Sequence, residues 1–259
     1  MVAHFVDLCS ADRRIVAAFL SGSNARDEAD AYSDLDLCLI ATDAAYDDVV
    51  ADRAAIIGRL GEPLFLENFG RGDNAFFILA DGTEGELFFA REGGLDAIDA
   101  GPYRPLVDKT GILAGAVVPF TEPDRAEQVE ELRRVLQWFW HDLSHFIAAL
   151  GRGQLWWGAG QLEALRAYCV NLARIEQHVE AQDEPYEKLD HVLSTTELEV
   201  LRSTFCPMER RAMLEAASDI LAFYRERAPI VAKAYGLPYP AELAELMCTR
   251  FDELEPASG

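Results

Sequence analysis

The chain has 259 residues, half of them hydrophobic, and a formal net charge of −22 at pH 7. This length and composition predict a globular protein with one large domain or two ordinary ones. The acidic surface would repel a phosphate backbone, which disfavours a polymerase or a tRNA-modifying enzyme, and we expect no nucleic-acid partner. The same charge would attract a cationic small molecule, although acidity that serves only solubility is the simpler alternative.

The chain shows no sign of export or of membrane insertion. Its five cysteines are scattered and form no CxxC pair, which is typical of reduced thiols in the cytosol. Residues 1–20 contain acids and no long apolar block, and no run approaches the roughly 18 apolar residues of a membrane helix. We therefore expect a cytoplasmic protein with no membrane partner.

The first half of the sequence alternates between strand and helix patterns. A short helix over 3–12 leads into an apolar strand, Ile15 to Leu20, and a Gly22-Ser23 turn. A polar segment with one helical turn then leads to a strand that opens with Asp34-Leu35-Asp36. Further along, the pattern predicts a helix over 44–60 and strands over 64–69, 75–80 and 85–90.

The second half is helical in pattern. Residues 91–120 are rich in Gly and Pro, with an apolar fragment at 106–112 and a strand predicted at 116–120, and we expect the crossing between domains there. Apolar stripes at helical spacing then predict helices over 121–150, 155–181, 195–205, 208–235 and 240–254. The domains are thus predicted as 1–120 and 121–259.

Asp34 and Asp36 project to the same face of an extended strand, because side chains alternate along it. Two carboxylates at such a short distance repel each other unless a hard divalent cation, Mg²⁺ or Mn²⁺, lies between them. Gly22 lets backbone N–H groups approach a phosphate, and the Ser23 hydroxyl can donate to one. Glu86 sits in mid-strand among apolar residues, where a metal or a proton-transfer role would offset its cost. An edge strand whose Glu86 meets water or a salt bridge is the alternative.

These residues resemble a known family. The GS turn followed by DxD at the start of a strand is similar to the nucleotidyltransferase superfamily related to DNA polymerase beta. The stretch GSNARDEADAYSDLDL resembles, more narrowly, the aminoglycoside and lincosamide nucleotidyltransferases. Those proteins carry a third carboxylate on a later strand, a position that matches Glu86. The resemblance covers residues 15–90 and is only loose beyond them.

The resemblance implies an α+β fold, with a mixed β-sheet flanked by helices, then an all-helical bundle that binds the acceptor, and an active site between the two domains. The implied reaction transfers a nucleoside monophosphate from an NTP to a hydroxyl of an aminoglycoside or lincosamide and releases pyrophosphate. We expect AMP from ATP, although the sequence does not specify which base is preferred. Asp34, Asp36 and Glu86 would hold the metal, with Glu86 as ligand, general base or both. Gly22 and Ser23 would bind the nucleotide.

Other readings stay open at this point. The acceptor could be a housekeeping small molecule or a protein, and the chain could be a non-catalytic nucleotide-binding or partner-binding protein of the same fold. The three carboxylates and the GS turn are all present, which disfavours the non-catalytic reading. The apolar second domain could form a homodimer, but nothing in the sequence specifies one.

A second group of residues lies near the expected acceptor side. His141 and His145 are spaced i, i+4 like the HExxH zinc site, but Asp142 replaces the glutamate base and no third ligand is evident. We interpret them as polar residues of a helix flank, with acceptor contact as the functional alternative. Trp140 and Trp156 could form an aromatic wall for the acceptor, and burial in the core or a dimer contact is their structural alternative.

Overall fold

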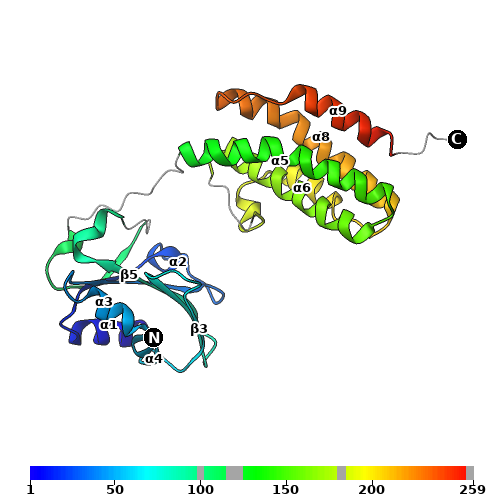
Figure 1. Ribbon diagram of the computed structural model, residues 1–259. Coiled ribbons are helices and arrows are strands. Elements are labelled where there is room, and N and C mark those ends of the chain that lie inside the picture. Colours follow the sequence, from blue (N-terminus) through cyan, green and yellow to red (C-terminus); the bar gives the residue numbers. More distant parts are fainter. Residues whose placement is uncertain (98–101, 115–124, 180–184, 255–259) are drawn as a thin grey trace. The chain divides into compact units, whose positions relative to one another are not determined.

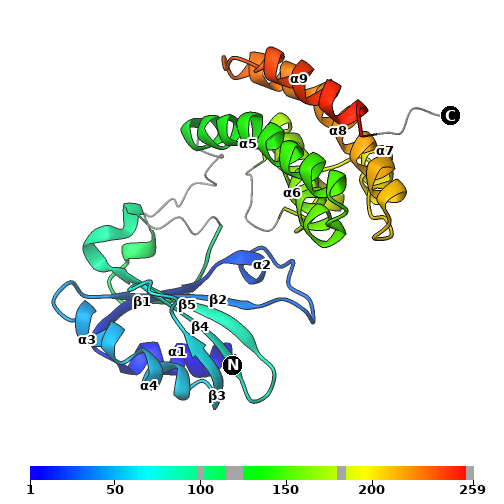
Figure 2. The same ribbon diagram turned by 45° about the vertical axis from the view of Figure 1, so that its right-hand side comes forward.

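The first unit of the protein is built on a β-sheet and the second is helical (Figures 1 and 2). The structure is a computed structural model that describes residues 1–97, 102–114, 125–179 and 185–254. This chain divides into two compact units, Met1–Glu122 and Pro123–Gly259. The fold class predicted from the sequence, a mixed sheet flanked by helices and followed by a helical bundle, is confirmed.

Six strands form one mixed sheet in the first unit, in the spatial order β3-β4-β5-β2-β1-β6. Their bounds are Ile15–Leu20 (β1), Leu35–Ala41 (β2), Pro63–Glu67 (β3), Asn74–Leu79 (β4), Glu84–Arg91 (β5) and Arg104–Asp108 (β6). The two central strands, β2 and β5, run parallel, and the other neighbours are antiparallel. The parallel pairing places the first residues of β2 and β5 at the same end of the sheet.

Three helices cover one face of this sheet (Figures 1 and 2). They are α1 (Val2–Ala11), α3 (Tyr46–Ala51) and α4 (Arg53–Gly58). Leu35, Leu37 and Leu39 of β2 join their apolar core, while Cys38 and Ile40 face the other way. Two short 3-10 helices, η1 (Glu92–Ala97) and η2 (Ile112–Ala114), lie along that second face. Asp36 belongs to the second face by alternation, beyond its apolar patch.

The second unit is a bundle with one continuous apolar core. Its helices are α5 (Arg125–Gly151), α6 (Leu155–Glu176), η3 (Leu189–His191), α7 (Thr195–Ser203), α8 (Arg210–Ala234) and α9 (Ala241–Asp252). α5 packs against α6 and α9, and α6 packs against α8. Phe139 and Tyr224 stack across the core with ring centroids 3.5 Å apart. A capping box between Ser194 and Glu197 begins α7.

Several predicted elements differ from the observed ones. The helix predicted over 44–60 is two helices, because the chain leaves helical geometry at Asp52, whose carboxylate pairs with Arg14 at 2.6 Å. The helical turn of the polar segment begins at Gly22 rather than after it, as α2 (Gly22–Ala25). β6 was predicted only as part of an apolar fragment. The strand predicted at 116–120 and the first residues of the helix predicted at 121 lie outside the described residues.

Two chain-wide features concern the cysteines and the helices. All five cysteines are free, and burial raises the pKa of the Cys9 thiol to about 12, which keeps that thiol protonated and unreactive at neutral pH. Of the helices that the structure describes, none is long and apolar enough to cross a bilayer.

Candidate active site

The centre of the candidate site is the close approach of Gly22 to Asp36. Past the end of β1, the Ser21 amide donates to the Asp36 carbonyl at 3.1 Å and holds the chain beside β2. Gly22 then adopts φ +60°, and a Cβ at this position would lie 1.8 Å from Oδ2 of Asp36. Only glycine fits there, because it accepts a positive φ and leaves the space that the carboxylate occupies. The Gly22 backbone and the Asp36 carboxylate are therefore in direct contact.

Asp36 and Glu86 are partners in the parallel ladder between β2 and β5. Paired residues on neighbouring strands lie about 4.8 Å apart and project to the same face. Both side chains are half-buried. The sequence placed both carboxylates on strands, and the register of the sheet now brings them side by side.

Asn74 is a site residue that the sequence analysis missed. It is 1% exposed, and its Nδ2 donates to Oε1 of Glu86 at 2.7 Å from the first position of β4. This bond orients the carboxylate and leaves Oε2 as the oxygen for a ligand or a proton. The Oδ1 of Asn74 is buried, and within the described residues it has no hydrogen-bond partner. The predicted strand began one residue later, at 75, so its alternation did not include this amide.

Asp34 and Ser23 flank this pair. Asp34 is exposed and directly precedes β2, and its carbonyl accepts from Nδ2 of Asn24 in α2 at 2.8 Å. That bond ties the helical turn that contains Ser23 to the start of the metal-binding strand predicted from the sequence. Asp34, Asp36 and Glu86 do not form a compact cluster of three ligand atoms. Among the described residues, the one such cluster is His141, Asp142 and His145 in the helical unit.

The donor set at this end of the sheet fits a hard divalent cation. Asp36 and Glu86 are side by side in the ladder, and the orphaned Oδ1 of Asn74 belongs to an amide that binds Glu86. Such cations prefer oxygen ligands, and a bound cation would offset the repulsion between two neighbouring carboxylates. Asp34, two residues before Asp36, can add a third carboxylate.

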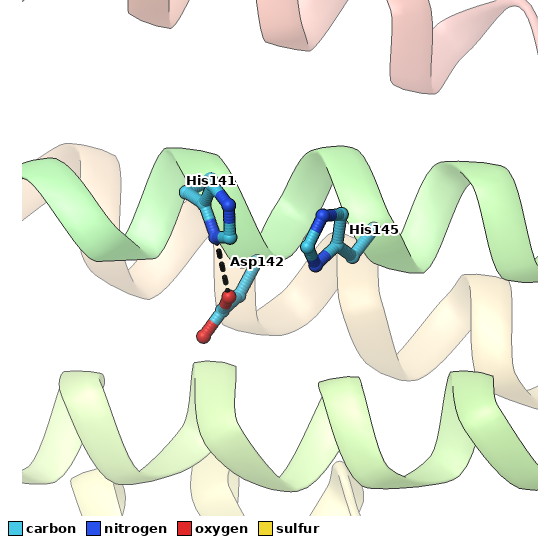
Figure 3. A group of neighbouring side chains, drawn as sticks. All are labelled: His141, Asp142 and His145. Carbon is cyan, nitrogen blue, oxygen red and sulfur yellow. Dashed lines mark hydrogen bonds and ion pairs between the residues drawn. The ribbon is translucent and has the colours of Figure 1, made fainter.

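The residues predicted for acceptor contact lie in the helical unit and differ in exposure. Trp140 is fully buried against Tyr224, as its core alternative predicted. Trp156 is 83% exposed and lines a hollow of about 610 Å³ with Trp157 and Met208. His141 and His145 lie on α5, next to Asp142, as one group of side chains (Figure 3). Trp140 presents no surface to a ligand, whereas the other three do.

Comparison with known families gives one match that covers nearly the whole sequence. The family profile described as streptomycin adenylyltransferase matches residues 1–252. The chain belongs to the streptomycin adenylyltransferase family. It is therefore a nucleotidyltransferase, as the resemblance of residues 15–90 predicted.

Two solved structures are similar to this member of the streptomycin adenylyltransferase family. An aminoglycoside 6-adenyltransferase from Bacillus subtilis is 15% identical with a TM-score of 0.45, over 98% of this chain and 97% of that one. A nucleotidyltransferase-like protein from Exiguobacterium sibiricum is 10% identical with a TM-score of 0.44, over 89% and 75%. Comparison with curated proteins gives no match. At these values the assignment rests on the profile alone.

Proposed function

We propose that this nucleotidyltransferase transfers AMP from ATP to a hydroxyl of an aminoglycoside antibiotic and releases pyrophosphate. The observation that carries the proposal is the in-register pair of Asp36 and Glu86 beside the close-fitting Gly22 backbone, in a member of the streptomycin adenylyltransferase family. The net charge of −22 also suits a cationic acceptor, which it would draw from solution.

Asp34, Asp36 and Glu86 are the residues that would hold Mg²⁺ or Mn²⁺. When bound, such an ion neutralises charge on the triphosphate and on the group that is transferred. Asp36 is positioned by its contact with Gly22, and Glu86 by its bond to Asn74. These two contacts support the assignment of Asp36 and Glu86, and the exposed Asp34 would complete the set.

The chemical step forms a bond between the acceptor oxygen and the α-phosphorus, and breaks the bond from that phosphorus to the pyrophosphate oxygen. Glu86 would accept the proton that the attacking hydroxyl loses, at the carboxylate oxygen that Asn74 does not bind. General-base catalysis of this kind contributes about 10²- to 10⁴-fold in rate. Gly22 and Ser23 would hold the phosphates through backbone N–H groups and the hydroxyl.

The helical unit is proposed to bind the acceptor. Trp156 is the best placed of the predicted contacts, because it is exposed and lines an apolar hollow. Aromatic faces bind cations and sugar rings, and an aminoglycoside offers both. His141 and His145 stay predicted contacts, and Trp140 is left out because it is buried.

The test is a pyrophosphate-release assay with Mg²⁺, each NTP in turn, and a panel of aminoglycosides, lincosamides and buffer. We expect release with ATP that depends on one aminoglycoside. Asp36→Asn should nearly abolish it, and Glu86→Gln should lower kcat by about 10²- to 10⁴-fold. Glu84→Gln is the matched control, since Glu84 lies on the same strand and is exposed.

Each part of the proposal can fail separately. Pyrophosphate release that requires a lincosamide would show that the proposed acceptor is wrong. The same conclusion would follow if no antibiotic supported release although MgATP still bound. Full activity in Asp36→Asn would contradict the metal assignment. Weakened ATP binding with unchanged turnover in Glu86→Gln would make Glu86 a binding or structural residue.

A further inference from the structure

The helical unit carries a cluster of side chains that takes no part in the chemical step of the proposed transfer. His141, Asp142 and His145 of α5 each offer one ligand atom, and these atoms all lie within 4.8 Å of one another. Figure 3 shows the two imidazole rings side by side, one turn apart, with the carboxylate next to them. The ring centroids are 4.2 Å apart, and Nδ1 of His141 lies 2.9 Å from Oδ1 of Asp142.

Neighbouring side chains hold this cluster in place. Tyr168 of α6 donates its hydroxyl to Oδ2 of Asp142 at 3.0 Å, and Asp142 is only 14% exposed. Trp157 lies against His145, with ring centroids 5.6 Å apart. The carboxylate and one imidazole are therefore oriented from outside the cluster.

Among the residues described, the His145 ring contacts the rings of His141 and Trp157, and its nitrogens have no hydrogen-bond or ion-pair partner. The side chain is half-buried. The two imidazoles and the carboxylate form an N₂O donor set, because His141 and His145 are spaced i, i+4 and Asp142 and His145 are spaced i, i+3. Asp142, which stands where the HExxH motif has its glutamate base, offers the third ligand atom.

We propose that His141, Asp142 and His145 bind a divalent first-row transition-metal ion, with Zn²⁺ as the expected occupant. Imidazole nitrogens suit Zn²⁺, Ni²⁺ and Cu²⁺, whereas Mg²⁺ prefers oxygen ligands alone. Tetrahedral Zn²⁺ with bonds of about 2.0–2.2 Å places its ligand atoms roughly 3.4 Å apart. Binding would require the ligand atoms, now within 4.8 Å of one another, to draw closer by rotation of the side chains.

Three protein ligands leave a fourth position open to water or to another ligand. The hydrogen bond from Tyr168 to Asp142 is the outer contact that metal-bound carboxylates commonly receive. An ion held there would occupy the ring nitrogens of two residues for which acceptor contact was the functional alternative. The inference is thus an alternative role for the two histidines, and it does not depend on the transfer reaction.

The experiment is a titration of the chelator-treated full chain with ZnCl₂ by calorimetry, followed by Co²⁺ titration with visible absorption as a readout of tetrahedral geometry. We expect one equivalent bound in the presence of excess Mg²⁺, and a higher Tm with the ion. His145→Gln should abolish this site, and Tyr168→Phe should weaken it by about 10- to 100-fold. Circular dichroism checks that each variant is folded.

The matched control is His191→Gln. His191 is 78% exposed and lies 3.9 Å from Asp190, so it is also a histidine next to an aspartate, but it belongs to no cluster of three ligands among the residues described. Its loss should leave the titration unchanged. Wild-type binding by folded His145→Gln, or an equal loss in His191→Gln, would overturn the proposal. The proposal would also be overturned if neither the wild type nor the His191→Gln control bound Zn²⁺.

Discussion

Replacing Gly22 by alanine should damage the active site far more than it damages the fold. Two costs follow from the structure. An alanine at φ +60° is destabilised by about 1–2 kcal/mol of backbone strain. Its Cβ would also lie 1.8 Å from Oδ2 of Asp36, whereas carbon–oxygen contacts lie at about 3.3 Å, so the carboxylate has to move by about 1.5 Å.

The expected magnitudes follow from these two costs. A misplacement of about 1 Å in a reacting group can cost about 10²-fold in rate, or roughly 2.7 kcal/mol of transition-state stabilisation. We therefore expect kcat/KM for pyrophosphate release to fall by about 10²-fold. The free energy of unfolding in urea should fall by only about 1–2 kcal/mol, which leaves an ordinary domain folded.

The control variant Gly111→Ala has the backbone strain of Gly22→Ala without the steric clash. Gly111 has φ +76°, and an added Cβ would meet nothing within 4 Å. It follows Asp108, which pairs with Ala17, so it lies at the end of β1 away from Gly22. This variant should lose the same stability and keep its activity. Wild-type kcat/KM in Gly22→Ala, or an equal loss of activity in Gly111→Ala, would refute the reasoning.

Two further predictions concern stability. The Arg14 guanidinium donates to Asp12 and holds the pKa of that carboxyl below its ordinary value of 3.8. Because the pKa of Asp12 is lower in the folded state than in the unfolded state, the ionised carboxylate stabilises the fold above pH 3.8. This stabilisation is lost as the pH falls through the folded-state pKa. Asp12→Asn should therefore lower the free energy of unfolding by about 1 kcal/mol at pH 7 and by nothing in strong acid, as pH-dependent urea unfolding would show. A constant difference at all pH values would assign the effect to packing instead. In the helical unit, Trp140→Ala should cost about 3–5 kcal/mol because its ring is fully buried, whereas Trp156→Ala, at 83% exposure, should cost less than about 0.5 kcal/mol. Equal costs in thermal or urea unfolding would contradict this placement of the two rings.

The elements that the sequence predicted well are those with strong local patterns. Ile15–Leu20 reads as a continuous apolar run and is a fully buried strand. The alternation around Asp36 and Glu86 also placed each carboxylate on a strand. The helical stripes of the second half likewise identified all five long helices of the described bundle, because burial of one face repeats with the period of the helix.

What the sequence did not predict depends on contacts between distant segments. β6 contains Pro105 and becomes a strand only by pairing with β1 at the edge of the sheet. The break at Asp52 coincides with its ion pair to Arg14, far away in the sequence. Asn74 meets Glu86 through the register of β4 on β5, and Tyr168 meets Asp142 through the packing of α6 on α5. None of these partners can be chosen from local periodicity.

The parallel pairing of β2 with β5 also ties the site to the folding of the whole first unit. The chain between these strands contains α3, α4, β3 and β4, so Asp36 and Glu86 become neighbours only after a long loop has closed. Both strands have partners on each side in the middle of the sheet, where amide hydrogens exchange most slowly. The carboxylate pair should therefore persist through any local opening of the edge strands, and it should be lost only when the sheet unfolds globally.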